Sequence, residues 1–110
     1  MKAVILSDNI PCGDLDGEWG LSVYIPFKDK NILLDCGASG LFLENAAKLG
    51  IDLSQTDYAV LSHGHFDHSD GMEHFFNTVK NAPFYVRTGC DACYILENGE
   101  MRYRGVPAAV

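Results

Sequence analysis

Residues 32–61 most constrain the fold of this chain, because they predict a strand, a helix and a second strand in immediate succession. Residues 32–34 are all branched aliphatic, as expected for a strand buried on both faces. Apolar residues then recur at three- and four-residue spacing over residues 41–49, and residues 58–61 form another apolar run. A strand, helix and strand in this order favour a parallel crossover. We therefore expect an α/β sheet.

The predicted helix has recognisable ends. Ser39 can cap its first turn, and Gly50 can supply the left-handed stop, with Ile51 folding back onto the helix. A second helix is expected at about residues 71–77. Further strands are predicted at residues 3–7, 21–27, 31–35, 84–87, 94–96 and 101–103, the last two joined by Asn98-Gly99, a pair typical of tight hairpin turns. The turn-rich loop at residues 8–20 is long enough to border a site.

Residues 62–71 concentrate three of the four histidines of the chain with two aspartates. If the chain stays extended after residue 61, His63 and His65 point to the same side and can bind one cation, with Gly64 allowing the backbone to bend between them. A turn after that would bring Asp67 and His68 towards a second cation. We interpret this cluster as a metal site rather than a chance group of solvated side chains. Imidazole and carboxylate ligands favour zinc, with iron or manganese as alternatives.

The pattern His63-x-His65-x-Asp67-His68 after an apolar strand resembles the metallo-beta-lactamase superfamily, whose signature is H-x-H-x-D-H preceded by a strand that ends in D-T-G. Here Asp35-Cys36-Gly37 stands at that upstream position. The resemblance covers about residues 3–87 and is closest to the branch of dihydropterin-linked ribofuranosylaminobenzene phosphate synthases. It is carried by residues 19–22 (WGLS), 43–46 (LENA), 49–52 (LGID) and 61–65 (LSHGH). Cys36 replaces the usual threonine and residues 69–71 (SDG) replace the usual TGG, but neither change removes a ligand.

The resemblance implies roles for individual residues. His63 and His65 would bind the first metal ion, and Asp67 and His68 the second, with Asp35 as a supporting carboxylate beside them. Asp67 would also orient the nucleophile and so act in catalysis. The implied reaction is hydrolysis, in which a metal-bound hydroxide attacks an ester, amide or phosphoryl substrate. The branch implies instead a transfer onto a pterin or phosphoribosyl substrate, and the sequence does not choose between them.

The length of the chain adds a second expectation from the resemblance. The superfamily domain is an αββα sandwich roughly twice as long, whose later half supplies one more histidine to each metal and a bridging aspartate. Residues 1–110 are therefore expected to form one metallo-beta-lactamase-like domain, truncated to the N-terminal half, with a mixed sheet and helices on one face. His74 is the only later histidine, and we expect it to be an exposed helical residue rather than a ligand. A homodimer or a second half-domain would complete the site; alternatively, the chain is a non-catalytic half-domain that dimerises and binds metal weakly or not at all.

The charge and the cysteine content limit which partners and which compartment we expect for this protein. With 8 Lys and Arg against 15 Asp and Glu, the net charge of −7 argues against nucleic acid and anionic membranes, and we expect a small-molecule substrate. The apolar run near the N-terminus ends at Asp8, too early for a signal peptide or membrane span. We therefore expect a cytoplasmic protein, and its four cysteines are expected to be free thiols in a reducing compartment. Cys90 and Cys93 are interpreted as ordinary buried thiols rather than a redox pair.

For two parts of the long loop, the sequence leaves two interpretations open. Asp8 and Asn9 either approach the metals or only form a turn. Trp19 either packs over a substrate or covers the core.

Overall fold

A mixed five-stranded sheet forms the centre of the protein in the computed structural model, which describes residues 2–89, 94–97, 99–103 and 106. Its spatial order is β1 (Val4–Ser7), β2 (Ser22–Phe27), β3 (Lys30–Leu34), β4 (Tyr58–Val60) and β5 (Phe84–Tyr85). The first three strands pair antiparallel, whereas β3, β4 and β5 run parallel. The expected α/β fold with a parallel crossover is confirmed.

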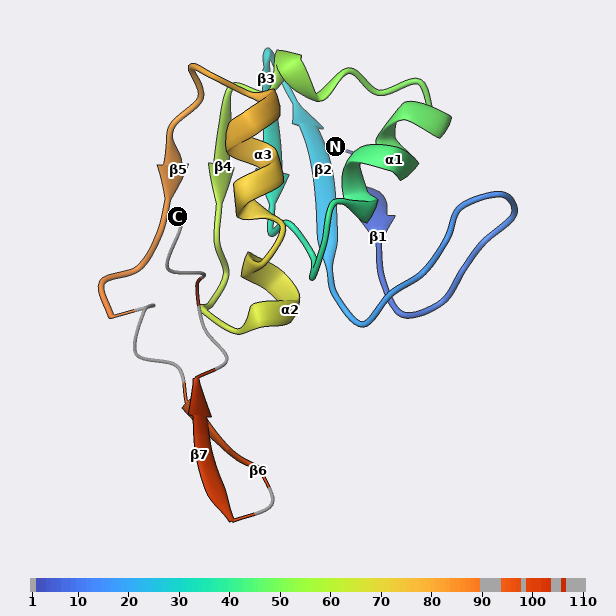
Figure 1. Ribbon diagram of the computed structural model, residues 1–110. Coiled ribbons are helices and arrows are strands. Elements are labelled where there is room, and N and C mark those ends of the chain that lie inside the picture. Colours follow the sequence, from blue (N-terminus) through green and yellow to red (C-terminus); the bar gives the residue numbers. More distant parts are fainter. Residues whose placement is uncertain (1, 90–93, 98, 104–105, 107–110) are drawn as a thin grey trace.

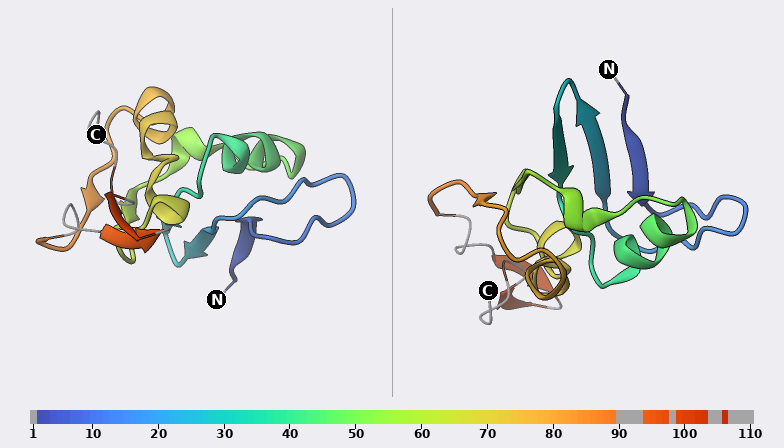
Figure 2. Two further views of the ribbon diagram at one scale, coloured as in Figure 1. Left: turned by 60° about the horizontal axis from the view of Figure 1, so that its bottom comes forward. Right: turned by 90° about the horizontal axis from the view of Figure 1, so that it is seen from above.

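The helices lie on one face of this sheet, as Figures 1 and 2 show. They are α1 (Leu41–Lys48), the short 3-10 helix η1 (Leu53–Gln55), α2 (Phe66–Ser69) and α3 (Met72–Thr78). This arrangement matches the expected N-terminal half of an αββα sandwich. No helix in the described part of the chain has the length and apolar character needed to cross a bilayer.

The core lies between the helices and the sheet. Leu33 of β3 and Ala59 of β4 pair directly and face Phe42 of α1 and Phe75 of α3, and all four side chains are fully buried. Because side chains alternate along a strand, one set of strand residues meets the helices while the other set points away. Burial of a large apolar side chain stabilises the fold by about 1.5–3 kcal/mol, so these contacts fix how the helices sit on the sheet.

The ends of α1 test the sequence prediction closely. At the C-terminus, Gly50 adopts a φ of +73°, and its N–H and that of Ile51 bond to the carbonyls of Ala47 and Ala46. This is the predicted left-handed stop. At the N-terminus the prediction was wrong by one residue, because Gly40 occupies the cap position. The side chain of Ser39 instead accepts a hydrogen bond from the Leu41 N–H.

The second face of the sheet is apolar, and no helix among the described residues covers it. One row of paired residues crosses all five strands, namely Ile5, Val23, Leu34, Val60 and Tyr85. Ile5 and Tyr85 at its two ends are 49% and 58% exposed. We refer to this surface as the open face.

The C-terminal hairpin is separate from the main sheet. Strands β6 (Tyr94–Glu97) and β7 (Glu100–Tyr103) pair antiparallel with each other and project from the rest of the fold (Figure 1). The predicted hairpin is confirmed, and Gly99 in its turn has a φ of +81°. Asn98, the other predicted turn residue, lies outside the described residues.

Backbone hydrogen bonds join the loop that follows β3, the segment before β2, and α2. The N–H of Cys36 donates to the carbonyl of His68 over 2.8 Å. Leu21 bridges the same two segments, since its N–H donates to the carbonyl of Asp67 and its carbonyl accepts from Gly37. The backbone around the histidine cluster is therefore fixed by bonds to segments far away in sequence.

Gly71 permits the closest of these approaches. A Cβ atom at this position would lie far inside van der Waals contact of the Cys36 carbonyl oxygen. We therefore predict that Gly71→Ala destabilises the protein by about 3 kcal/mol or more in urea unfolding followed by circular dichroism. Gly13 is the matched control, because a Cβ there meets nothing within 4 Å and only its φ of +62° opposes alanine. Gly13→Ala should cost about 1 kcal/mol; equal losses in the two variants would contradict the prediction.

Candidate metal centre

The histidine cluster lies where two parallel strands end. Asp35 directly follows β3, and Ser62 and His63 come shortly after its neighbour β4. Because parallel strands end at the same edge of a sheet, residues distant in sequence meet there, and ligands collect at such edges in α/β folds. His65 then caps α2, which carries Asp67 and His68.

The structure brings all five predicted site residues together. One potential ligand atom from each of Asp35, His63 and His68 lies within 4.8 Å of the others, and the same holds for His63, His65 and Asp67. The ring centroid of His63 is 4.9 Å from that of His65 and 4.1 Å from that of His68. His63 is common to both groups and occupies the centre of the cluster.

Asp35 organises the first group through a buried carboxylate. Its side chain is fully buried and accepts three hydrogen bonds, from the Ser62 N–H (2.7 Å), the Ser62 hydroxyl (2.6 Å) and Nδ1 of His68 (2.7 Å). Its backbone adopts a φ of +60°, a left-handed conformation that aspartate tolerates better than most residues. Strain of this kind persists only where surrounding contacts hold the residue in place. Here the three hydrogen bonds do so.

These bonds decide which atoms remain available to a cation. A carboxylate only accepts hydrogen bonds, so Nδ1 of His68 carries the proton and Nε2 is left free. That Nε2 lies 3.5 Å from Oδ2 of Asp67, on the side of the ring away from Asp35. Asp35 is therefore occupied within the hydrogen-bond network, whereas the atoms of His63, His65 and Asp67 form the group open to a ligand.

The environment also favours neutral imidazole at His63. Partial burial, followed by the neighbouring rings of His68 and His65, lowers the pKa of His63 below its usual value. Only the neutral ring has a lone pair to give to a metal ion. The cluster is thus suited to bind a divalent cation at neutral pH.

Cys36, which stands where the family commonly has threonine, takes no part as a ligand. Its side chain is fully buried, and burial, with the adjacent Asp35 carboxylate, raises the pKa of its thiol well above the usual value. The thiol stays protonated, and a metal ligand or nucleophile must be a thiolate. Its contribution to the site is the backbone bond to His68.

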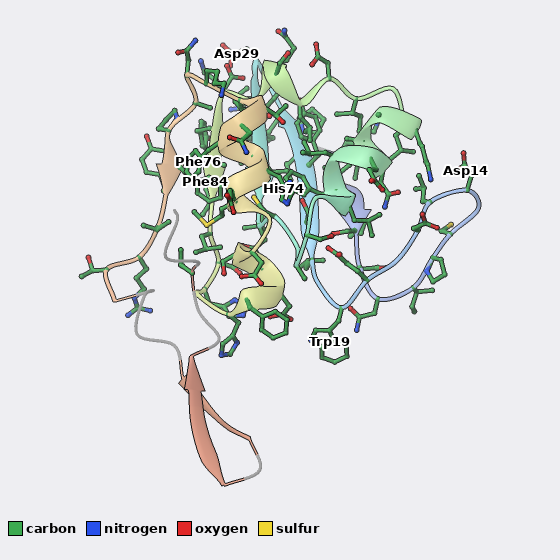
Figure 3. The ribbon with its side chains drawn as sticks, viewed as in Figure 1. Asp14, Trp19, Asp29, His74, Phe76 and Phe84 are labelled. Carbon is green, nitrogen blue, oxygen red and sulfur yellow. The ribbon has the colours of Figure 1, made fainter. Side chains whose placement is uncertain are left out.

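The other candidates from the sequence lie outside the cluster. His74 is exposed on α3, as expected. Asp8 accepts a hydrogen bond from the Ile10 N–H, which is a turn contact, whereas Asn9 accepts one from the Gly20 N–H across the long loop. Trp19 is 68% exposed and does not cover the core. Its ring extends from the end of the fold that carries α2 (Figure 3).

The predictions for two cysteines cannot be compared with the structure. Cys90 and Cys93 lie outside the described residues.

Sequence reasoning missed two residues that shape the site. Ser62 connects Asp35 to His63, with 2.9 Å between its Oγ and Nδ1 of His63. Glu18 reaches from the long loop to the segment after Asp35, where its carboxylate accepts hydrogen bonds from the Ala38 N–H and the Ser39 hydroxyl. The only signal for Ser62 was its place between a strand and the first histidine, and Glu18 had none beyond its position in a loop of unusual length.

The family model that describes the metallo-beta-lactamase superfamily matches residues 20–102 of the sequence. The chain belongs to this superfamily. The match includes Asp35, where the upstream motif stands, and the whole histidine cluster.

Similar proteins support the same assignment. An uncharacterized protein of Methanocaldococcus jannaschii is 37% identical over 70 residues, which are 64% of this chain and 27% of that protein. Among solved structures, Tm1679, a metal-dependent hydrolase of the beta-lactamase superfamily, is 30% identical with a TM-score of 0.74 over 96% of this chain and 36% of its own. The metallo-beta-lactamase GOB-18 from Elizabethkingia meningoseptica is 25% identical with a TM-score of 0.56, over 66% of this chain and 27% of its own. The chain thus spans about a third or less of the length of these relatives.

The donor set fits the divalent metals that the family implies. Three imidazoles and one carboxylate are borderline ligands, suited to zinc and to its transition-metal neighbours. The hydrogen bond from His68 to Asp35 is the kind of outer contact that fixes a metal-binding ring.

Asp35→Asn tests this interpretation of the carboxylate. Asparagine has the same shape and tolerates a positive φ, but one of its terminal groups is a donor NH2, so it cannot accept all three hydrogen bonds from Ser62 and His68. We predict that zinc affinity, measured by calorimetry, falls about 10- to 100-fold while most of the folding stability is retained. Asp35→Ala should instead lower stability as well, because three donors from Ser62 and His68 lose their shared acceptor. Unchanged zinc affinity in Asp35→Asn would show that the carboxylate does not support the site.

Proposed function

We propose that this protein is a metal-dependent hydrolase that uses His63, His65, Asp67 and His68 to bind one or two divalent cations, with zinc as the first candidate. The convergence of these side chains at the carboxyl end of β4 is the observation that carries the proposal. Membership of the superfamily and the similarity to a metal-dependent hydrolase support it.

The residues of the cluster would have different roles in this reaction. A bound cation supplies Lewis acidity, which lowers the pKa of water to near neutrality and polarises an ester, amide or phosphoryl oxygen. His63 and His65 hold this cation on the exposed side of the cluster, and Asp35 keeps the ring of His68 in one orientation. Asp67 is half-buried beside them, where its carboxylate can accept a proton or orient a nucleophile.

We propose the substrate class from the net charge of the chain. The net charge of −7 disfavours polyanionic nucleic acid, which leaves a small molecule as the proposed substrate. Transfer onto a pterin or phosphoribosyl substrate, which the sequence resemblance implies, stays an alternative, because the relative from Methanocaldococcus jannaschii is uncharacterized.

Replacement of one ligand tests the function. We predict that the wild-type chain binds zinc or manganese stoichiometrically in elemental analysis and hydrolyses a generic ester or phosphodiester. His65→Ala should reduce turnover by about two orders of magnitude, because an exposed ligand is lost without a change in the core. His74→Ala is the matched control, since this histidine is exposed on α3 and outside the cluster.

The same experiment separates the two functions that the sequence leaves open. A wild-type protein that is folded, free of metal and inactive would support the non-catalytic half-domain instead. Equal activity in the wild type and His65→Ala would place the chemistry elsewhere.

We also propose that a second copy of this chain covers the open face. Its central rows, Ile5-Val23-Leu34-Val60-Tyr85 and Ile25-Ile32-Tyr58, contain no charged side chain. Two copies with a net charge of −7 repel each other, and an uncharged face is where this repulsion opposes contact least. Two sheets can stack with such apolar faces buried between them, and a twofold dimer brings the same face of each copy together.

Two exposed positions on the open face test the dimer. We predict that the wild type is a dimer in size-exclusion chromatography with light scattering, and that the double variant Ile5→Lys and Tyr85→Lys is monomeric. Leu49→Lys is the control, because this residue is 42% exposed and caps the C-terminal end of α1, on the helix side of the sheet. A wild type that stays monomeric at all concentrations, or a dimer that survives the double variant, would show that another polypeptide or solvent meets this face.

A further inference from the structure

Ser62 stands between the buried carboxylate and the central histidine of the cluster. Its hydroxyl oxygen lies 2.6 Å from Oδ2 of Asp35 and 2.9 Å from Nδ1 of His63. Its backbone N–H donates to the other oxygen of Asp35 over 2.7 Å. The backbone bond to Asp35 therefore fixes the position of Ser62. Its hydroxyl contacts Asp35 on one side and His63 on the other.

Counting protons determines the direction of these bonds. Oδ2 of the Asp35 carboxylate can only accept, and a hydroxyl has a single proton. If that proton pointed to His63, two acceptor oxygens would face each other at 2.6 Å with nothing between them. The hydroxyl therefore donates to Asp35. Its contact with His63 then requires that Nδ1 of His63 carry a proton and donate to Oγ.

The consequence reaches both histidines beside the carboxylate. His68 donates from Nδ1 directly to Asp35, and His63 donates from Nδ1 through Ser62. In both rings Nε2 is then the nitrogen with the free lone pair. One buried carboxylate thus sets the same tautomer in two imidazoles whose centroids lie 4.1 Å apart.

We propose that Ser62 is a positioning residue that extends the hydrogen bonding of Asp35 to His63, holding Nδ1 of that ring protonated and presenting Nε2 to the cation. The inference rests on the proposed metal binding by His63. It goes beyond it by assigning a role to a side chain that contacts no metal or substrate. Among the residues that the structure describes, the Ser62 hydroxyl is the one hydrogen-bond partner of the His63 ring. Without it, nothing described selects between the tautomers, and an isolated imidazole favours the proton on Nε2, the wrong nitrogen for this site.

The tautomer can be measured directly in the metal-free full chain. Long-range ¹H–¹⁵N NMR correlations at neutral pH distinguish the two ring nitrogens of each histidine. We expect Nδ1–H for His63 and His68 in the wild type. In Ser62→Ala, His63 should change to mainly Nε2–H while His68 stays as it was, and zinc affinity should fall about tenfold. Ser62→Thr keeps the hydroxyl and should restore both the tautomer and an affinity within about twofold of the wild type.

A control variant and the measurement on the wild type separate this proposal from effects on folding and on activity. Ser54 is exposed and bonds only to Asp52 and its own turn, so Ser54→Ala should change neither readout. Nε2–H on His63 in the wild type, an unchanged tautomer in Ser62→Ala, or no rescue by Ser62→Thr would each overturn the proposal. A wild type with the expected tautomers but no affinity for zinc would overturn the proposed function and leave the relay from Asp35 to His63 intact.

Discussion

The buried carboxylate of Asp35 is the interaction on which the rest of the site depends. It accepts hydrogen bonds from the backbone and side chain of Ser62 and from His68, and so joins the end of β3 to the loop after β4 and to α2. A buried carboxylate without such partners would be strongly destabilising. The network therefore holds the left-handed backbone of Asp35 and the orientation of the histidines at the same time. Folding and ligand geometry depend on one group.

The sheet has two apolar faces, and only one of them is covered by helices of the described residues. One meets α1 and α3 around Phe42 and Phe75, which closes a core within the chain. The open face has no partner among the described residues, although its rows of Ile, Val, Leu and Tyr are as apolar as a core. In related proteins this chain corresponds to only part of a longer polypeptide, 36% of it in the metal-dependent hydrolase Tm1679. The described part of the chain thus presents the histidine cluster and an apolar sheet face together.

Much of this could be read from the sequence because the signals are local. Apolar spacing located α1, Gly50 located its end, and residues 58–61 followed by His63 placed the cluster at a strand end. Local sequence signals predicted the start of α1 less accurately, because a single hydrogen bond can decide which residue caps a helix. Gly40 rather than Ser39 occupies the cap position of α1. A one-residue shift of this kind depends on the path of the preceding loop, which Glu18 fixes from a distance.

The sequence by itself determined the class of fold, the family and the side chains that can bind a cation, because the periodicity of strands and helices and the spacing of His63, His65, Asp67 and His68 are properties of neighbouring residues. Only the tertiary structure decided which atoms of those side chains are free. Asp35 and His68 are 33 positions apart, and Asp35 and Ser62 are 27 apart, so no local pattern reveals their hydrogen bonds. The direction of a proton within the cluster follows from packing two parallel strands side by side.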